Sequence, residues 1–192
     1  MKPENDPLRP LYTCLSIPCP VRLDDYRFSL NEADDDWFNP MSPHPVTFDG
    51  IQFPTTEHLF QWLRFVGLPA IQAAIRTAPS PVQAREVAVE HLLAIGHRIW
   101  SETDVDALRR AMRAKLTQYP CLHDHLTATG RVHLVADVGD WEPCFHPYWG
   151  AVEVEGEWRG ENIAGRLWMQ LRDELNAPAA SSLTQPTLGT QK

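Results

Sequence analysis

The sequence predicts a single α+β domain that is mostly helical and contains a small set of short strands. Apolar residues recur at helical spacing in several segments. The strand-like runs are short and do not alternate strictly with the helices, which disfavours a doubly wound sheet. A chain of 192 residues suits one domain with a substantial core. We expect this domain over residues 25–176, between a flexible proline-rich arm (1–24) and a disordered tail (177–192).

The domain is expected to open with strands. The first predicted strand is Tyr26–Leu30, and an acidic loop over 31–36 follows it. A β-hairpin comes next, because the runs Val46–Phe48 and Ile51–Phe53 flank Asp49-Gly50, a dipeptide that favours a two-residue hairpin turn.

A helix is predicted directly after the hairpin. Thr55 or Thr56 can cap it, and Glu57 falls in its first turn, where the helix dipole favours an anion. Gly67 and Pro69 stop the helix. The residues expected on its core face are Leu59, Trp62, Leu63 and Val66.

A polar stripe runs beside that core face. Glu57, Gln61 and Arg64 stand at i, i+4 and i+7, so they project from one side of the helix. The structural interpretation is a solvated face with an ordinary Glu–Arg pair. The functional interpretation is a set of ligand-binding side chains, and the stripe alone does not separate the two.

Three more helices are predicted before the next strand. Ser80, with Pro81 at the first helical position, caps a helix that runs to Gly96. Thr103 begins a longer helix, and a short one spans 121–128. The apolar face of the longer helix is formed by Val105, Leu108, Met112, Leu116 and Tyr119.

The last elements are a strand and a helix. Residues 132–137 alternate in a strand pattern, with Val132, Leu134 and Ala136 on one face. A final helix begins near Asn162. Its buried residues are expected to be Ile163, Leu167, Trp168, Leu171 and Leu175.

Composition excludes several classes of function. The formal charge of −8 and the pI near 5.4 argue against general nucleic-acid binding, although a few local arginines suffice for a small anionic ligand. No apolar run approaches membrane-spanning length, and the N-terminus shows no signal-peptide core. We therefore expect a cytoplasmic protein that does not bind membranes. The sequence leaves the oligomeric state open.

No cofactor or metal is expected. The chain contains no GxGxxG or P-loop motif. Cys14, Cys19, Cys121 and Cys144 match neither a disulfide framework nor a zinc site, so reduced thiols are predicted. His123 and His125, near Cys121, are expected at the surface and not at a metal.

An ordered series of motifs resembles the NADAR family of YbiA-like N-glycosidases. The run Pro54–His58, followed by Phe60-Gln61 and Arg64-Phe65, resembles the signature helix of that family. The later matches are Ser80-Pro81 with Ala84-Arg85, Arg109–Gln118, Thr127–Val135, Tyr148–Gly150, and Gly160–Arg166 with Met169 and Arg172. Several matches in the same order are more specific than any one of them.

The resemblance implies hydrolysis of an N-glycosidic bond. The implied substrates are phosphoribosyl or ADP-ribosyl compounds, such as a riboflavin-pathway ribosylamine or ADP-ribosylated guanine, and the partner would be a small phosphorylated ligand. A non-catalytic module that binds ADP-ribose or a related nucleotide is the alternative. A helical protein-interaction domain is a third possibility.

Three residues are candidates for catalysis. A carboxylate can stabilise positive charge at the sugar carbon, which favours Glu57, and His58 can protonate the departing nitrogen. Lys115 can attack the ring-opened sugar as a Schiff base. The structural alternatives are a histidine bonded to a backbone carbonyl and a lysine that extends along the border of its helix.

The remaining candidates are expected to bind substrate. Trp149-Gly150 can place an indole against a base or ribose, with core packing as its alternative. Gly160 and Asn162 can present helix N–H groups to phosphate, although Asn162 also suits simple capping. The other members of this set are Phe38 and Asn39, in a segment that resembles the family's Ser-Asn-Phe, together with Gln61 and Arg64.

Three positions depart from the family pattern. Arg64 replaces a lysine, and arginine cannot form a Schiff base. Ala136 stands where a glutamate is usual, and the neighbouring Asp137 is expected on the opposite face of the strand. His146 stands where an aspartate is usual. These changes put catalysis in question and motivate the alternative of a binding module.

Overall fold

The structure of the protein is a computed structural model that describes residues 25–30, 36–95, 101–139, 148–154 and 157–177. The predicted arm, most of the predicted tail, Gly96 and His146 lie outside these residues. The elements, in chain order, are β1 (Tyr26–Ser29), β2 (Val46–Phe48), β3 (Ile51–Phe53), α2 (Thr56–Arg64), α3 (Pro69–Arg76), α4 (Pro81–Glu90), the 3-10 turn η1 (Leu92–Ile95), α5 (Glu102–Gln118), α6 (Pro120–Ala128), β4 (Leu134–Asp137), β5 (Val152–Val154), β6 (Glu157–Arg159) and α7 (Ile163–Asn176).

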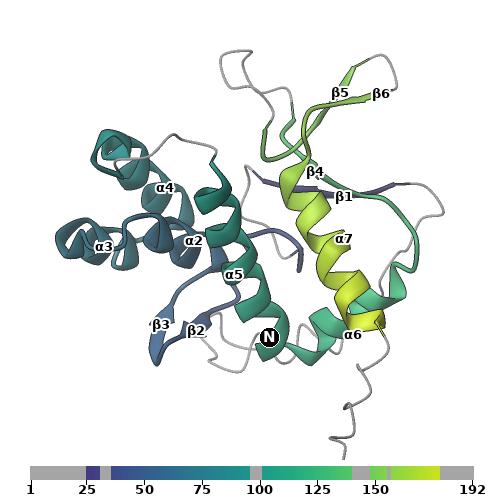
Figure 1. The fold of residues 1–192 in the computed structure, drawn as a ribbon, viewed down its shortest axis with the longest axis horizontal. Helices are drawn as coiled ribbons and strands as arrows, with labels where there is room; N and C mark the ends of the chain where they lie inside the picture. Colours follow the sequence, from purple (N-terminus) through teal and green to yellow (C-terminus); the bar gives the residue numbers. More distant parts are fainter. Residues whose placement is uncertain (1–24, 31–35, 96–100, 140–147, 155–156, 178–192) are drawn as a thin grey trace, which may run out of the picture.

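Helix α5 runs through the middle of the molecule (Figure 1). The helices α2, α3 and α4 lie on one side of it, while α7, β1 and β4 lie on the other. Helix α2 packs against α5, and α7 packs against both α5 and β4. The predicted class, a mostly helical α+β domain with few short strands, is confirmed.

The described strands form three separate pairs. The first and fourth strands pair in parallel, with Tyr26 opposite Leu134. Strands β2 and β3 form the predicted antiparallel hairpin, and both turn residues, Asp49 and Gly50, have positive φ, as a tight hairpin turn of this kind requires. Strands β5 and β6, which sequence patterns did not reveal, form a second hairpin.

Most of the predicted helix boundaries hold, and the errors have local causes. Thr55 caps α2 and Ser80 caps α4, as expected. Helix α5 begins at Glu102 because Ser101, not Thr103, is its cap. Helix α4 ends at Glu90 and not near Gly96. Helix α3 was not predicted, because Pro69 was assigned only to the end of the preceding helix, whereas it stands at the first position of α3.

The principal core joins α2, α5, α6, α7 and the β1–β4 pair. Val66 was predicted to face this core, which is wrong, because it lies beyond the end of α2 and is 71% exposed. The alternating pattern predicted for β4 is also wrong. Leu134, Val135 and Ala136 are all buried, since the strand is covered on both faces.

Cys121 is disulfide-bonded, which contradicts the prediction that all four thiols are reduced. Within the described ranges, no helix is long and apolar enough to cross a membrane.

Candidate active site

Glu57 is fixed by the first turn of α2. The Thr55 hydroxyl caps the helix by accepting the His58 N–H, at 3.3 Å. The N–H of Glu57 donates to the Pro40 carbonyl, at 2.8 Å, and this ties the helix start to the segment Trp37–Ser42. The Glu57 side chain is 2% exposed, so a carboxylate is held almost entirely inside the protein. A buried carboxylate requires specific partners.

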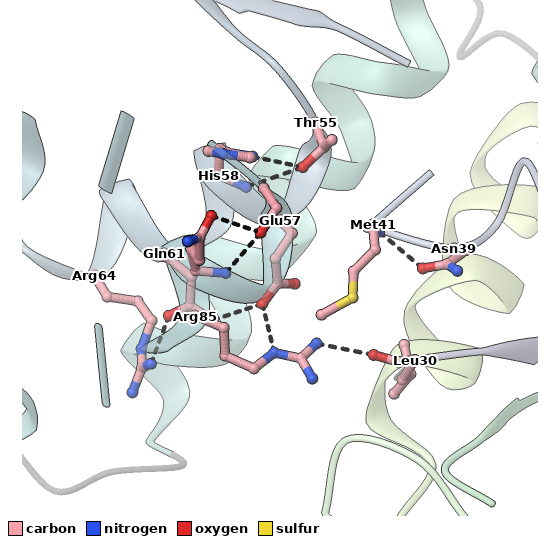
Figure 2. A network of polar contacts seen from close by, with 11 residues as sticks. Leu30, Asn39, Met41, Thr55, Glu57, His58, Gln61, Arg64 and Arg85 are labelled. Carbon is pink, nitrogen blue, oxygen red and sulfur yellow. Dashed lines mark hydrogen bonds and ion pairs between the residues drawn. The ribbon is translucent and has the colours of Figure 1, made fainter. Parts of the chain in front are cut away.

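Those partners occupy one oxygen of the carboxylate. Glu57 Oε1 accepts hydrogen bonds from Gln61 Nε2 and from Arg85 Nε, each at 2.9 Å. Figure 2 shows the second oxygen, Oε2, turned away from both donors, and it accepts no hydrogen bond within the described part of the chain. One oxygen therefore fixes the orientation of the group, and the other remains available to stabilise a positive charge.

Arg85, on α4, is the cation paired with Glu57, and it was not among the predicted site residues. Its Nε pairs with Glu57, and its Nη2 donates to the Leu30 carbonyl at 2.9 Å. The side chain is 30% exposed, while its partner carboxylate is buried. Its place beside Ala84 in a family motif was the one indication available in the sequence.

Arg64 is instead held in a structural ion pair. Its Nε donates to Asp104 Oδ1 on α5 at 2.9 Å, and the two side chains are 8% and 0% exposed. Its Nη1 donates to Gln61 Oε1, also at 2.9 Å. The Glu57–Arg64 pair of the structural interpretation is therefore absent. The polar chain instead runs from Asp104 through Arg64, Gln61 and Glu57 to Arg85 (Figure 2 shows its Arg64–Arg85 part).

His58 is bonded to a backbone carbonyl, which is the structural alternative to a catalytic role. Its Nε2 donates to the Ala78 carbonyl at 3.1 Å, and its Nδ1 accepts from the Thr55 hydroxyl at 2.8 Å. Burial lowers the pKa of this imidazole, which stabilises the neutral ring that these two bonds require. Both ring nitrogens are occupied, and the ring points away from the Glu57 carboxylate (Figure 2).

The Lys115 side chain, on α5, is fully buried and is hydrogen-bonded to the segment Trp37–Ser42. Its Nζ donates to the Trp37 carbonyl at 2.6 Å, the Asn39 carbonyl at 3.2 Å and the Ser42 hydroxyl at 2.6 Å. Three acceptors match the three N–H groups of an ammonium ion. Since a nucleophilic amine needs a free lone pair, this arrangement suits a positioning role better than attack on a sugar.

His44 adjoins the group formed by Lys115, Trp37, Asn39 and Ser42, which we call the lysine cluster. The Ser42 hydroxyl donates to the Asn39 carbonyl and accepts from Lys115, so the His44 Nδ1, 2.8 Å away, acts as a donor. The ring stacks on Trp37 at 3.8 Å. Burial, with a smaller contribution from the Lys115 charge, lowers the pKa of His44 to about 3, so the ring stays neutral.

Phe38 and Asn39 belong to the segment Trp37–Ser42, and their contacts hold this segment in place. The Phe38 ring is fully buried, and its carbonyl accepts the indole N–H of Trp168 at 2.9 Å. The Asn39 side-chain oxygen accepts the Met41 N–H at 2.8 Å. Both residues were predicted to bind substrate, and the structure places them in contacts that shape the loop beside Glu57.

Trp149 packs against α2, and the neighbouring Gly150 packs against β4. The Trp149 ring meets Phe60 of α2 edge to face, with centroids 5.3 Å apart, and it is only partly buried. A Cβ on Gly150 would lie 2.2 Å from the Ala136 carbonyl oxygen. The close approach that requires glycine here is therefore to β4.

Asn162 and Gly160 organise the start of α7. The Asn162 side chain accepts the Ala136 N–H at 3.0 Å and donates to the Leu134 carbonyl at 2.9 Å, so it binds β4 and makes no capping bond. The backbone N–H groups of residues 162–164 donate to carbonyls of residues 148–150. Gly160, with φ of 144°, supplies the turn before them. These N–H groups are not available to a phosphate in this arrangement.

Two of the three positions that depart from the family pattern, Arg64 and Ala136, lie within the described residues. Asp137 Oδ1 accepts the Gly139 N–H at 2.7 Å, and the β1–β4 register contains no bulge, so Asp137 does not take the place of the usual glutamate at Ala136. Within the described residues, no group of three or more His, Cys, Asp and Glu side chains is placed to hold a metal ion.

The fold and this arrangement define a NADAR domain. The family model for the NADAR domain matches residues 25–176, so the chain belongs to that family, as the resemblance predicted. Its relatives include the N-glycosidase YbiA of Escherichia coli (strain K12), which is 28% identical over 155 residues that cover 80% of this chain and 91% of YbiA. The NMR structure of E. coli YbiA superposes with a TM-score of 0.59 at 26% identity, covering 83% of this chain and 94% of that one.

A second kind of relative is larger. The chloroplastic riboflavin biosynthesis protein PYRR of Zea mays is 32% identical over an alignment of 162 residues that covers 76% of this chain but 25% of the maize protein. A riboflavin biosynthesis protein of Vibrio vulnificus is 28% identical over 143 residues, which are 36% of its length. The chain thus spans about a quarter of the maize protein and nearly all of YbiA.

Proposed function

We propose that the protein hydrolyses the N-glycosidic bond of a phosphoribosyl or ADP-ribosyl compound, with Glu57 as the carboxylate at the reacting sugar carbon. The observation that carries the proposal is the geometry of Glu57. Gln61 and Arg85 fix one of its oxygens, while the other accepts no hydrogen bond within the described residues. The naming of YbiA as an N-glycosidase supports this choice of bond.

The chemistry follows from that geometry. As the bond between the sugar carbon and nitrogen breaks, its electron pair leaves with the nitrogen and positive charge develops on the sugar. A preorganised carboxylate oxygen stabilises this charge without reorganising. Water then adds its oxygen to the sugar carbon, and the proton that it loses balances the one taken up by the departing nitrogen.

The other two catalytic candidates take positioning roles in this proposal. Both nitrogens of His58 are committed to Thr55 and Ala78, so the ring supports the first turn of α2. Lys115 holds the segment Trp37–Ser42, whose Pro40 carbonyl receives the N–H of Glu57. The proton for the leaving nitrogen therefore comes from solvent in this scheme.

Turnover of two substrates tests the proposal. The purified protein is incubated with a ribosylaminopyrimidine phosphate and with ADP-ribosylated guanosine, and the released base is measured by chromatography. Release from either substrate, above a protein-free control, is the expected result, and it also identifies the substrate class. Stable substrate in both reactions at enzyme concentrations above the ligand Kd would contradict the proposal.

A second candidate is a module that binds the same ligands without turnover. The observation in its favour is that Arg64, which replaces the family lysine, is held by Asp104 through Nε and by Gln61 through Nη1. Saturable binding of both compounds with no release of base would identify this function.

A further inference from the structure

We propose that Arg85 is the residue that selects a phosphorylated substrate, an inference that rests on the proposed function of the same site. The sequence placed Arg64, and not Arg85, among the predicted substrate-binding residues. The structure separates the two arginines, because Arg64 is 8% exposed and paired with Asp104, whereas the Arg85 side chain is 30% exposed.

Two of the three guanidinium nitrogens of Arg85 donate to acceptors of the protein. Nε donates to Glu57 and Nη2 donates to the Leu30 carbonyl. Nη1 has no hydrogen-bond partner within the described residues, and Figure 2 shows it pointing away from both acceptors. The two N–H groups of Nη1 are therefore oriented by contacts made elsewhere on the same rigid guanidinium plane.

The ligand class follows from the chemistry of that group. A guanidinium matches the oxygens of a phosphate, and a guanidinium that is already oriented loses little side-chain entropy when it binds. Its attachment to Oε1 of Glu57 sets the phosphate contact at a fixed distance from the oxygen that faces the sugar. Arg85 would thereby align a phosphorylated sugar with the carboxylate.

Fragment binding tests this role without requiring turnover. The Kd values of ribose 5-phosphate and of ribose are measured by NMR titration for the wild type, Arg85→Gln and Arg85→Lys. The control is Arg76→Gln, which removes the same charge from an exposed position of α3. We expect Arg85→Gln to weaken ribose 5-phosphate by about 10- to 100-fold and to leave ribose unchanged.

The lysine variant guards against a folding defect. In Arg85→Lys the ammonium can retain the ion pair with Glu57 but cannot present a second, oriented nitrogen, so phosphate selectivity should fall while the fold persists. Equal losses for both sugars, a loss equal to that of Arg76→Gln, or a wild type that does not favour the phosphorylated sugar would overturn the proposal. Selective binding without release of base from any substrate would instead count against the proposed hydrolysis and leave the role of Arg85 standing.

Discussion

Buried charges decide which residues of α2 are available for chemistry. Glu57 and Arg64 belong to one stripe, but each is neutralised by a residue from a different helix, Arg85 of α4 and Asp104 of α5. The second pair is almost entirely removed from solvent, so its role is structural. The first pair retains a partly exposed guanidinium and a carboxylate oxygen without a partner in the described residues.

Removal of Arg64 should destabilise the protein. Arg64→Ala removes one partner of the buried Arg64–Asp104 ion pair, and we expect the free energy of unfolding to fall by about 3–5 kcal/mol in urea titrations. The control is Arg113→Ala, which breaks an exposed pair with Glu174 and should cost at most about 1 kcal/mol. Equal stability of the two variants would show that the Arg64–Asp104 pair is not a structural element.

A covalent role for Lys115 can be tested directly. The three hydrogen bonds of its ammonium group predict that borohydride added during turnover traps no sugar on Lys115, as measured by mass mapping of peptides. A Lys115 adduct that appears only with substrate would show that the lysine leaves these contacts and acts as the nucleophile.

At the scale of elements, local patterns and long-range contacts differ in how far the sequence predicts them. The hairpin turn Asp49-Gly50 and the caps Thr55 and Ser80 were predicted because each depends on residues within a few positions. The pairing of Glu57 with Arg85 was not, since two cations compete for it and only tertiary packing decides between them. Burial of the whole Lys115 side chain depends in the same way on the loop that covers it.

The junction between β4 and α7 depends on Gly150. In Gly150→Ala the new methyl carbon would lie 2.2 Å from the Ala136 carbonyl oxygen and 2.7 Å from Val138 Cγ1, so backbone must shift. We expect a loss of about 1–3 kcal/mol or more in stability, measured by thermal denaturation. Gly67→Ala is the comparison, because it meets no atom within 4 Å and carries only the cost of a positive φ, about 1–2 kcal/mol.

If Gly150→Ala were no less stable than wild type, the close contact with β4 would not constrain this position. A milder effect than that of Gly67→Ala would likewise contradict the account of the junction.

At the scale of the whole molecule, the lysine cluster makes stability depend on pH. His44 has a pKa of about 3 in the folded protein and about 6.5 when unfolded, so between these values the unfolded chain binds more protons. The free energy of unfolding therefore falls as pH decreases below 6.5, with a contribution of up to about 1.4 kcal/mol per pH unit from this residue.

His44→Asn isolates that contribution. Its amide can still donate to Ser42, but it does not titrate, so urea titrations from pH 7 to pH 4 should show a shallower loss of stability than in wild type. His123→Asn, at an exposed position of α6, should retain the wild-type slope. Parallel slopes for the wild type and His44→Asn would contradict the assignment.

The central claim, that Glu57 stabilises the positive charge of the sugar, is tested most directly by single-turnover release of base from the better substrate. Glu57→Gln keeps the shape of the side chain and removes its charge, and it should lower the rate constant by about 100-fold or more while the thermal transition remains cooperative. Glu86→Gln, exposed on α4, should match the wild type. A Glu57→Gln rate within about threefold of wild type would remove Glu57 from the mechanism.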